Sequence, residues 1–296
     1  MTFLEYTRSG NRIRFEDKQF ARRTALGTLV LAEACDYKGT FLDDIINGIY
    51  LICEETAWQL PPIIPTSVIR LPFLCLIPHV LSSIFFAAET GAVLAVAVWL
   101  LRDELRAVSP LIEKQVVRCL KERILEPYLK EHFWWMGDGV SPMNNWTIWC
   151  TQNVLMTAAL WEEDEEISRA ILQKAAKSAD FFLAEYGDDG CCDEGPQYYR
   201  HAGLCLFNTI EIMNGMTDHS FSSLYREPQN LQYSRLPLQR PCLRTLLHQF
   251  FRLCRCRRPV QCQRIPLRKA HRTEGTDGTG CWRLPHNTGS PFNAGA

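Results

Sequence analysis

Apolar side chains recur at helical spacing over most of the first 228 residues of the chain. The pattern predicts helices over residues 21–38, 41–58, 84–106, 110–126, 147–161, 167–186 and 199–215. The second of these places Ile45, Ile49, Ile52 and Cys53 on one face. No strong alternation typical of strands precedes residue 225. We therefore expect an all-α fold built from stacked, antiparallel helix hairpins.

Signals for helix starts stand where the apolar pattern is interrupted. Thr40 can cap the second predicted helix, because its hydroxyl can accept a hydrogen bond from a free backbone N–H. Ser109 is followed by Pro110, which pairs a good capping residue with the residue favoured at the first helical position. Asn144 or Asn145 can cap the helix over residues 147–161.

Three stretches fall outside this pattern. Residues 1–20 are polar and mixed, and we interpret them as a lead-in. Residues 63–83 are apolar without a helical period and contain no acidic residue, which is unusual for a loop. Residues 229–296 are rich in Arg, Pro and Cys, and we expect a basic tail without a stable fold. The helical domain is therefore predicted to span residues 21–228, with an anomalous loop at 63–83.

Composition and charge narrow the classes of function. The formal net charge of −1 gives no overall basic field, so we expect no nucleic-acid partner. The thirteen cysteines are scattered without the spacing of a metal site. We expect buried thiols in a reducing compartment, with no metal and no cofactor. Residues 84–101 contain Glu89 and Gly91, which favours a core helix over a membrane span. The N-terminus shows no signal-peptide pattern, so we expect a cytoplasmic location and no membrane partner.

Residues that can carry chemistry gather at two predicted helix starts. The first cluster is Asn144, Asn145 and Trp146, and the second closes on Glu194, Tyr198, Tyr199, Arg200 and His201. An amide, a phenol, an imidazole and a guanidinium at one site would suit removal of a proton beside a carboxylate. Each also has a structural interpretation: the asparagines as helix caps and the tyrosines as packing residues at a helix start. The aromatic pair Trp134 and Trp135 would serve either sugar stacking or packing between helices.

The motif Asn144–Trp149, followed by Asp189–Tyr199, resembles the heparinase II/III-like polysaccharide lyases. The resemblance covers about residues 8–58 and 84–228. It implies an incomplete (α/α) toroid followed by a C-terminal β-sandwich, and cleavage of uronic-acid polysaccharides by β-elimination. An acidic polysaccharide or oligosaccharide would then be the partner.

The resemblance also implies roles for individual residues. It assigns Asn145 (or Asn144) to the substrate carboxylate, and Tyr199 (or Tyr198) to the base or acid. His201 would complete the catalytic set. The substrate-binding residues would be Trp134, Trp135, Trp146, Arg200 and Glu194.

Two alternatives remain open. A glycoside hydrolase on an (α/α) toroid would use paired carboxylates from Asp188, Asp189, Asp193 and Glu194. A remnant without catalysis would at most bind sugar. The further catalytic histidines of the family fall in stretches that this chain does not match, so we expect weak or no lyase activity from the chain as it stands.

The stretches 63–80 and 247–263 interrupt the resemblance in a particular way. When they are back-translated, a shift of one base in the reading frame permits peptides that resemble the family at both places. We therefore hypothesise that both stretches are out of frame. Resequencing of the gene tests this, because uninterrupted frames that encode the present residues of both stretches would contradict it.

Overall fold

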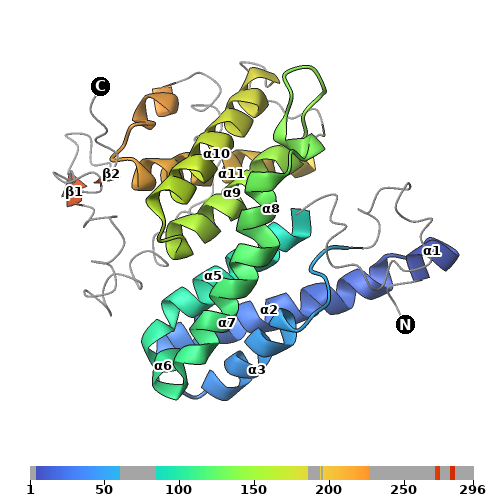
Figure 1. Cartoon of the computed structure of the whole chain (residues 1–296), viewed down its shortest axis with the longest axis vertical. Coiled ribbons are helices and arrows are strands. Elements are labelled where there is room, and N and C mark those ends of the chain that lie inside the picture. The colour runs from blue at the N-terminus through green and yellow to red at the C-terminus, as the bar shows by residue number, and fades with distance from the viewer. Residues whose placement is uncertain are drawn as a thin grey trace. The chain divides into compact units, whose positions relative to one another are not determined.

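The computed structural model describes residues 5–60, 85–185, 194, 196–226, 271–273 and 281–283 (Figure 1). The chain divides into two compact units, Met1–Trp134 and Trp135–Ala296, which we take in turn. The anomalous loop at 63–83 lies outside the described residues, as does all of the 229–296 tail except its two short strands.

The first unit is built from helices. Its elements are α1 (Glu5–Ser9), α2 (Ile13–Asp36), α3 (Leu42–Cys53), α5 (Phe85–Leu100), α6 (Arg102–Val108), α7 (Pro110–Leu120), the π-helical turn η3 (Lys121–Leu125) and α8 (Glu126–Lys130). Helix α2 begins at Ile13, so the helix starts earlier than the position near residue 21 expected from the sequence, and part of the lead-in is helical.

Helices α2 and α3 pack against each other and are joined by a short connection, which makes them an antiparallel hairpin. The expected cap at Thr40 is wrong, because α3 starts after Phe41 and no side chain caps it. The buried carboxylate of Glu33 binds the connection instead, accepting hydrogen bonds from the N–H groups of Gly39 (2.6 Å) and Phe41 (2.9 Å). Tyr37 ends α2 in the left-handed conformation (φ 56°). The α2–α3 turn is therefore fixed by a side chain from within α2.

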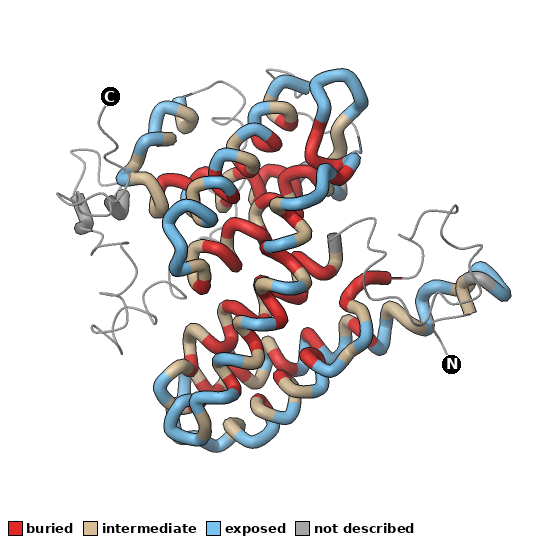
Figure 2. Tube along the Cα trace, viewed as in Figure 1, coloured by how far each residue is buried: buried red, intermediate tan, exposed pale blue. Residues whose placement is uncertain are grey.

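Helix α5 is a core helix, as its strongly apolar sequence, interrupted by Glu89 and Gly91, predicts. None of its described side chains is exposed (Figure 2). A Cβ atom on Gly91 would lie 3.0 Å from Ile124 Cγ1, so the glycine permits a close approach of α5 to η3. No helix among the described residues is long and apolar enough to span a membrane.

Helix α7 starts as the sequence predicts. The side chain of Ser109 accepts a hydrogen bond from the N–H of Leu111, and Pro110 occupies the first helical position. The helical path does not end near residue 126 but continues through η3 and α8 to Lys130. Pro127 lies within this continuous path, just after the π-helical turn η3, where the backbone hydrogen-bond pattern changes. Burial would raise the pKa of Glu113, but hydrogen bonds from Arg102 and Arg106 lower it to about 2.

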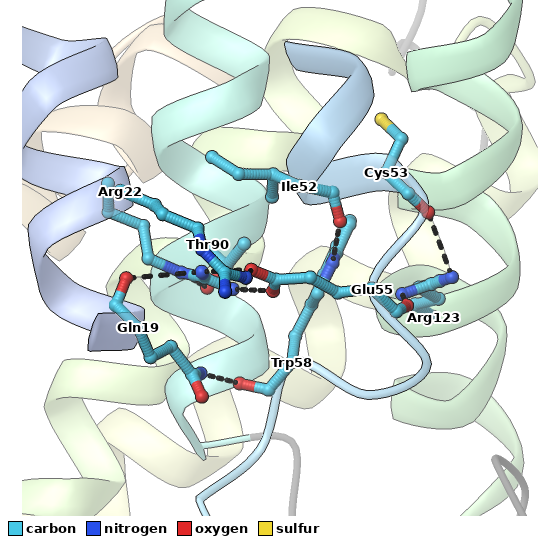
Figure 3. A network of polar contacts seen from close by, with 9 residues as sticks. Gln19, Arg22, Ile52, Cys53, Glu55, Trp58, Thr90 and Arg123 are labelled. Atoms are coloured by element: carbon cyan, nitrogen blue, oxygen red, sulfur yellow. Dashed lines mark hydrogen bonds and ion pairs between the residues drawn. The ribbon is translucent and has the colours of Figure 1, made fainter. Parts of the chain in front are cut away.

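A buried ion pair joins the elements of the first unit (Figure 3). Arg23 of α2 donates from Nη1 to Glu55 Oε1 (2.9 Å), with Nη2 on the other carboxylate oxygen and Nε on Thr90 Oγ1 (3.0 Å). The same carboxylate accepts a hydrogen bond from Arg22. This pairing satisfies a charge that would otherwise be buried alone. The segment after α3 is thereby tied to α2 and α5.

The segment after α3 has further anchors, also visible in Figure 3. Trp58 donates from Nε1 to the carbonyl of Ile52 (2.8 Å), and its own carbonyl accepts from Gln19 Nε2 (2.7 Å). The guanidinium of Arg123 lies 4.8 Å from the centre of the Trp58 ring and donates to the carbonyl oxygens of Cys53 (3.1 Å) and Glu55 (2.7 Å). Helix α3 ends at Cys53, earlier than the expected end near Trp58, and these contacts hold the irregular segment that follows.

The residues described in the second unit include three long helices. Its elements are the 3₁₀ turn η4 (Trp134–Met136, which begins on the last residue of the first unit), α9 (Asn145–Trp161), α10 (Glu165–Glu185), α11 (Pro196–Met216) and the 3₁₀ turn η5 (Ser222–Arg226). Helix α9 packs against both α10 and α11 and is the most buried of the three (Figure 2). The acidic run 162–166 is a turn over residues 162–164 followed by the first two residues of α10, so the helix starts two residues earlier than the expected Ile167. Within it Asp164 Oδ1 caps α10 by accepting from the N–H groups of Glu166 and Ile167.

Beyond Arg226 the described residues are two short strands, β1 (His271–Thr273) and β2 (Cys281–Arg283). They pair antiparallel, with Arg272 opposite Trp282. Every regular element described up to Arg226 is a helix, which confirms the all-α prediction for that part of the chain.

Candidate functional site

The start of α9 places the two asparagines in different roles. Asn144 has an extended backbone, and its Oδ1 accepts a hydrogen bond from the N–H of Trp146 (2.9 Å). Asn144 is therefore the N-cap, and Asn145 is the first helical residue. This confirms the cap predicted from the sequence and leaves the side chain of Asn145 free of a capping role.

Asn145 binds a carboxylate. Its side chain is 1% exposed, and Nδ2 lies 2.7 and 2.8 Å from the two carboxylate oxygens of Glu194. The backbone N–H of Asn145 donates to the same carboxylate (2.7 Å). The positive end of the α9 dipole also favours an anion at this place. The Asn145–Glu194 pair is thus a carboxylate held by a side-chain amide and by a helix N-terminus.

The loop before Asn144 is held by interactions within the second unit. Gly137 has φ +87°, and a Cβ atom there would lie 2.6 Å from the Phe181 ring, so only glycine fits. Hydrogen bonds from Ser141 and Val140 lower the pKa of Asp138 to about 2. Glu185 accepts a hydrogen bond from the N–H of Met143 (2.6 Å). These contacts define the path by which the chain enters α9.

His201 lies on the face of α11 that packs against α9. Its ring meets Trp149 edge to face, with centroids 4.2 Å apart at 77°, and Nε2 lies 3.7 Å from Cys205 Sγ. Burial lowers the pKa of His201, so the imidazole is mostly neutral at neutral pH. It can accept a proton there, but it supplies little positive charge.

The sequence motif did not single out the polar side chains that join α9 to α11 further along. Asn208 Nδ2 donates to Gln152 Oε1 (3.0 Å), and both side chains are half-buried. Together with Trp149 and His201 they form what we call the α9–α11 polar stripe, defined as Trp149, Gln152, His201 and Asn208. The helical spacing of 149 and 152 on one helix, and of 201 and 208 on the other, is the signal that could have found it.

The predicted tyrosines lie in the first turn of α11. Tyr198 is 42% exposed, whereas the side chains of Tyr199 and Arg200 are outside the described residues. Their assignments to acid, base and carboxylate binding therefore stay predictions. That either tyrosine lies at the same site as Asn145 is likewise still a prediction.

The three tryptophans predicted to bind substrate have different surroundings. Trp135 is 0% exposed, so it is a core residue, which agrees with the packing alternative for this side chain and not with sugar stacking. Trp134 belongs to the first unit and is 54% exposed. Trp146 is half-buried in the first turn of α9, next to the Asn145–Glu194 pair in sequence.

Polar atoms left without partners concentrate on α9. Asn145 Oδ1, Thr147 Oγ1 and Asn153 Nδ2 are buried and have no hydrogen-bond partner among the residues described. Buried polar atoms normally have hydrogen-bond partners, so these three atoms of α9 could still accept or donate hydrogen bonds. Within the described ranges no group of three His, Cys, Asp or Glu side chains is placed to hold a metal ion.

In comparisons with family models and with curated proteins, nothing matches this chain. The resemblance to the lyases therefore stays a prediction from the two sequence motifs.

Proposed function

We propose that this chain is a polysaccharide-lyase-like protein, whose site is suited to β-elimination on a uronic-acid-containing polysaccharide. We propose with it that the helix hairpins are part of an incomplete (α/α) toroid. The observation that carries the proposal is the Asn145–Glu194 pair, in which a buried amide and a helix N-terminus bind a carboxylate.

The chemistry explains why such a group is needed. The proton at C5 of a uronate is a weak acid, and it becomes removable only when the neighbouring carboxylate is neutralised. An amide that donates to this carboxylate also stabilises the enolate-like charge that develops as the proton leaves. In this proposal the substrate carboxylate takes the place of Glu194 on Asn145. Glu194 is then an internal stand-in for the substrate and not a direct sugar ligand.

The proton itself would be taken by Tyr199, following the resemblance. A free phenol has a pKa of about 10, so it needs a cation nearby to act as a base at neutral pH. His201 is poorly suited to provide that charge, because burial lowers its pKa. Arg200 is the remaining candidate in sequence. The neutral His201 fits a role in accepting or relaying a proton.

An ultraviolet assay over a panel of acidic polysaccharides tests the reaction. Elimination leaves an unsaturated sugar that absorbs in the ultraviolet, whereas hydrolysis does not. We expect a version with residues 63–80 and 247–263 restored to the shifted frame to release unsaturated products, and the unaltered chain to release few or none. New reducing ends without ultraviolet absorption would instead support the hydrolase alternative. Robust elimination by the unaltered chain would overturn the expectation of weak activity.

Replacing Glu194 tests the stand-in role in the otherwise unaltered chain. We expect Glu194→Gln to tighten binding of a uronate oligosaccharide by about tenfold, because hydrogen bonds to a charged group are worth about 1.5–3 kcal/mol and the competing internal carboxylate loses its charge. Calorimetric titration measures the affinity. The matched control is Glu185→Gln, which removes a carboxylate that binds the Met143 N–H instead of Asn145. Equal affinities in both variants would mean that Glu194 only stabilises the start of α9 and does not compete with the substrate carboxylate for Asn145.

A further inference from the structure

Two buried cysteines meet in the first unit. Cys53 is the last residue of α3, and Cys119 lies in the last turn of α7. Both are buried, and both lie where α3 meets α7, because Arg123, one helical turn after Cys119, donates to the carbonyl of Cys53 (3.1 Å). Helices α3 and α7 are far apart in sequence and pack against each other.

Cationic groups surround this pair of thiols. Arg123 donates to the carbonyl of Cys53 (3.1 Å), and its guanidinium is kept in place by the carbonyl of Glu55 and the ring of Trp58 (Figure 3). Arg118 is the second cation near Cys119. Gln115 adds an amide N–H at 3.9 Å from Cys119 Sγ. Positive charge and N–H donors favour a thiolate over a thiol.

The two sulfurs differ in acidity. The hydrogen bond from Cys53, with Arg123 and Arg118, lowers the pKa of Cys119 to about 7. The hydrogen bond with Cys119 and burial raise the pKa of Cys53 far above its ordinary value. Cys119 is therefore the sulfur that ionises near neutral pH, and Cys53 keeps its proton.

We propose that Cys53 and Cys119 are a redox-active pair that closes to a disulfide between α3 and α7. The oxidant that suits a buried pair is a small hydroperoxide, with hydrogen peroxide as the simplest case. The Cys119 thiolate attacks one peroxide oxygen, the O–O bond breaks, and protonation of the departing hydroxide gives water and a sulfenic acid. The Cys53 sulfur then attacks the Cys119 sulfur, and the sulfenic oxygen leaves as a second water with the Cys53 proton. The sum is two thiols and one peroxide giving one disulfide and two waters.

The disulfide would have a structural consequence. It would link the C-terminal ends of two helices next to the segment that Arg123 and Trp58 anchor. A cross-link between residues distant in sequence restricts the unfolded chain and so stabilises the folded one. The pair would therefore make the stability of the first unit depend on redox state.

Mass spectrometry of the whole purified chain tests the proposal. The reduced protein is treated with one equivalent of hydrogen peroxide, alkylated and digested. We expect a linked peptide pair containing Cys53 and Cys119, its loss on treatment with dithiothreitol, and a thermal midpoint raised by about 5–15 °C in the oxidised form. This measurement uses the unmodified chain, so it does not depend on whether a variant folds.

Cysteine variants provide the controls. Cys53→Ser and Cys119→Ser are each expected to lose both the linked peptide and the shift in midpoint. Cys150→Ser, which removes a buried cysteine of the second unit, should keep both. The proposal is overturned if peroxide modifies the exposed Cys35 first without linking Cys53 to Cys119, or if Cys119 stops at an alkylation-resistant oxidised form while Cys53 stays free.

Discussion

Replacing Asn145 with alanine is expected to weaken binding of a uronate oligosaccharide by about 10–150-fold, the loss of a hydrogen bond to a charged group worth about 1.5–3 kcal/mol. In a catalytically complete, frame-corrected chain it should also slow elimination by about 10²–10³-fold, since the amide would act where charge develops. Titration calorimetry and the ultraviolet assay measure the two effects. Tyr199→Phe should slow the reaction in the same chain and leave binding nearly unchanged, because the phenol would move a proton and would not hold the carboxylate.

The control for Asn145 is its neighbour. Asn144→Ser keeps a side-chain oxygen that can cap the Trp146 N–H and adds no charge, so helix α9 should start as before and binding should change little. The thermal midpoint of each variant separates loss of the site from loss of the fold. Normal binding and turnover in folded Asn145→Ala would remove Asn145 from the proposed mechanism.

Replacing Arg23 with methionine is expected to lower the free energy of unfolding by about 3–5 kcal/mol. The substitution keeps much of the side-chain volume but leaves the carboxylate of Glu55, which is 11% exposed, without its bidentate partner. Thr90 and the carbonyl of Gln19 lose a donor as well. Burial raises the pKa of Glu89, and Arg23 is the charge that opposes this, so Glu89 should become still harder to ionise in the variant. Denaturant unfolding of the full chain, followed by circular dichroism, measures the change.

Arg22 provides the matched comparison. It bonds to the same carboxylate but its side chain is 51% exposed, so Arg22→Met should cost less than about 1 kcal/mol. The double variant with Glu55→Gln should restore part of the loss in Arg23→Met, since the buried charge is then gone. Similar, small losses from Arg22 and Arg23 would show that the network adds little to stability.

Local signals in the sequence were sufficient to predict most helices and several of their ends. Apolar spacing located the core of α3, and it recognised α5 as a buried helix. Ser109 and Asn144 cap helices as their side-chain chemistry predicts. These features depend on residues within one or two turns of each other, which is the range over which periodicity and capping act.

Helix ends controlled by distant partners were harder to predict. The sequence favours Thr40 as the cap of α3, but no side chain caps this helix, and the carboxylate of Glu33 binds the N–H groups of the preceding turn. The continuation of the helix through η3 and α8 past Pro127 is not predicted from the sequence, because proline ordinarily interrupts a helix. Trp134 and Trp135 are adjacent in sequence and alike in chemistry, yet one is exposed and the other is in the core.

The sequence by itself determined that the regular elements described up to Arg226 are helices, where several of them begin, and which faces are apolar, because those properties are local. Only the tertiary structure decided which polar groups meet: Arg23 with Glu55 across 32 positions, Asn145 with Glu194 across 49, and Cys53 with Cys119. Pairing at such separations depends on how helices pack, and a buried charge or amide is tolerated only where packing brings it a partner.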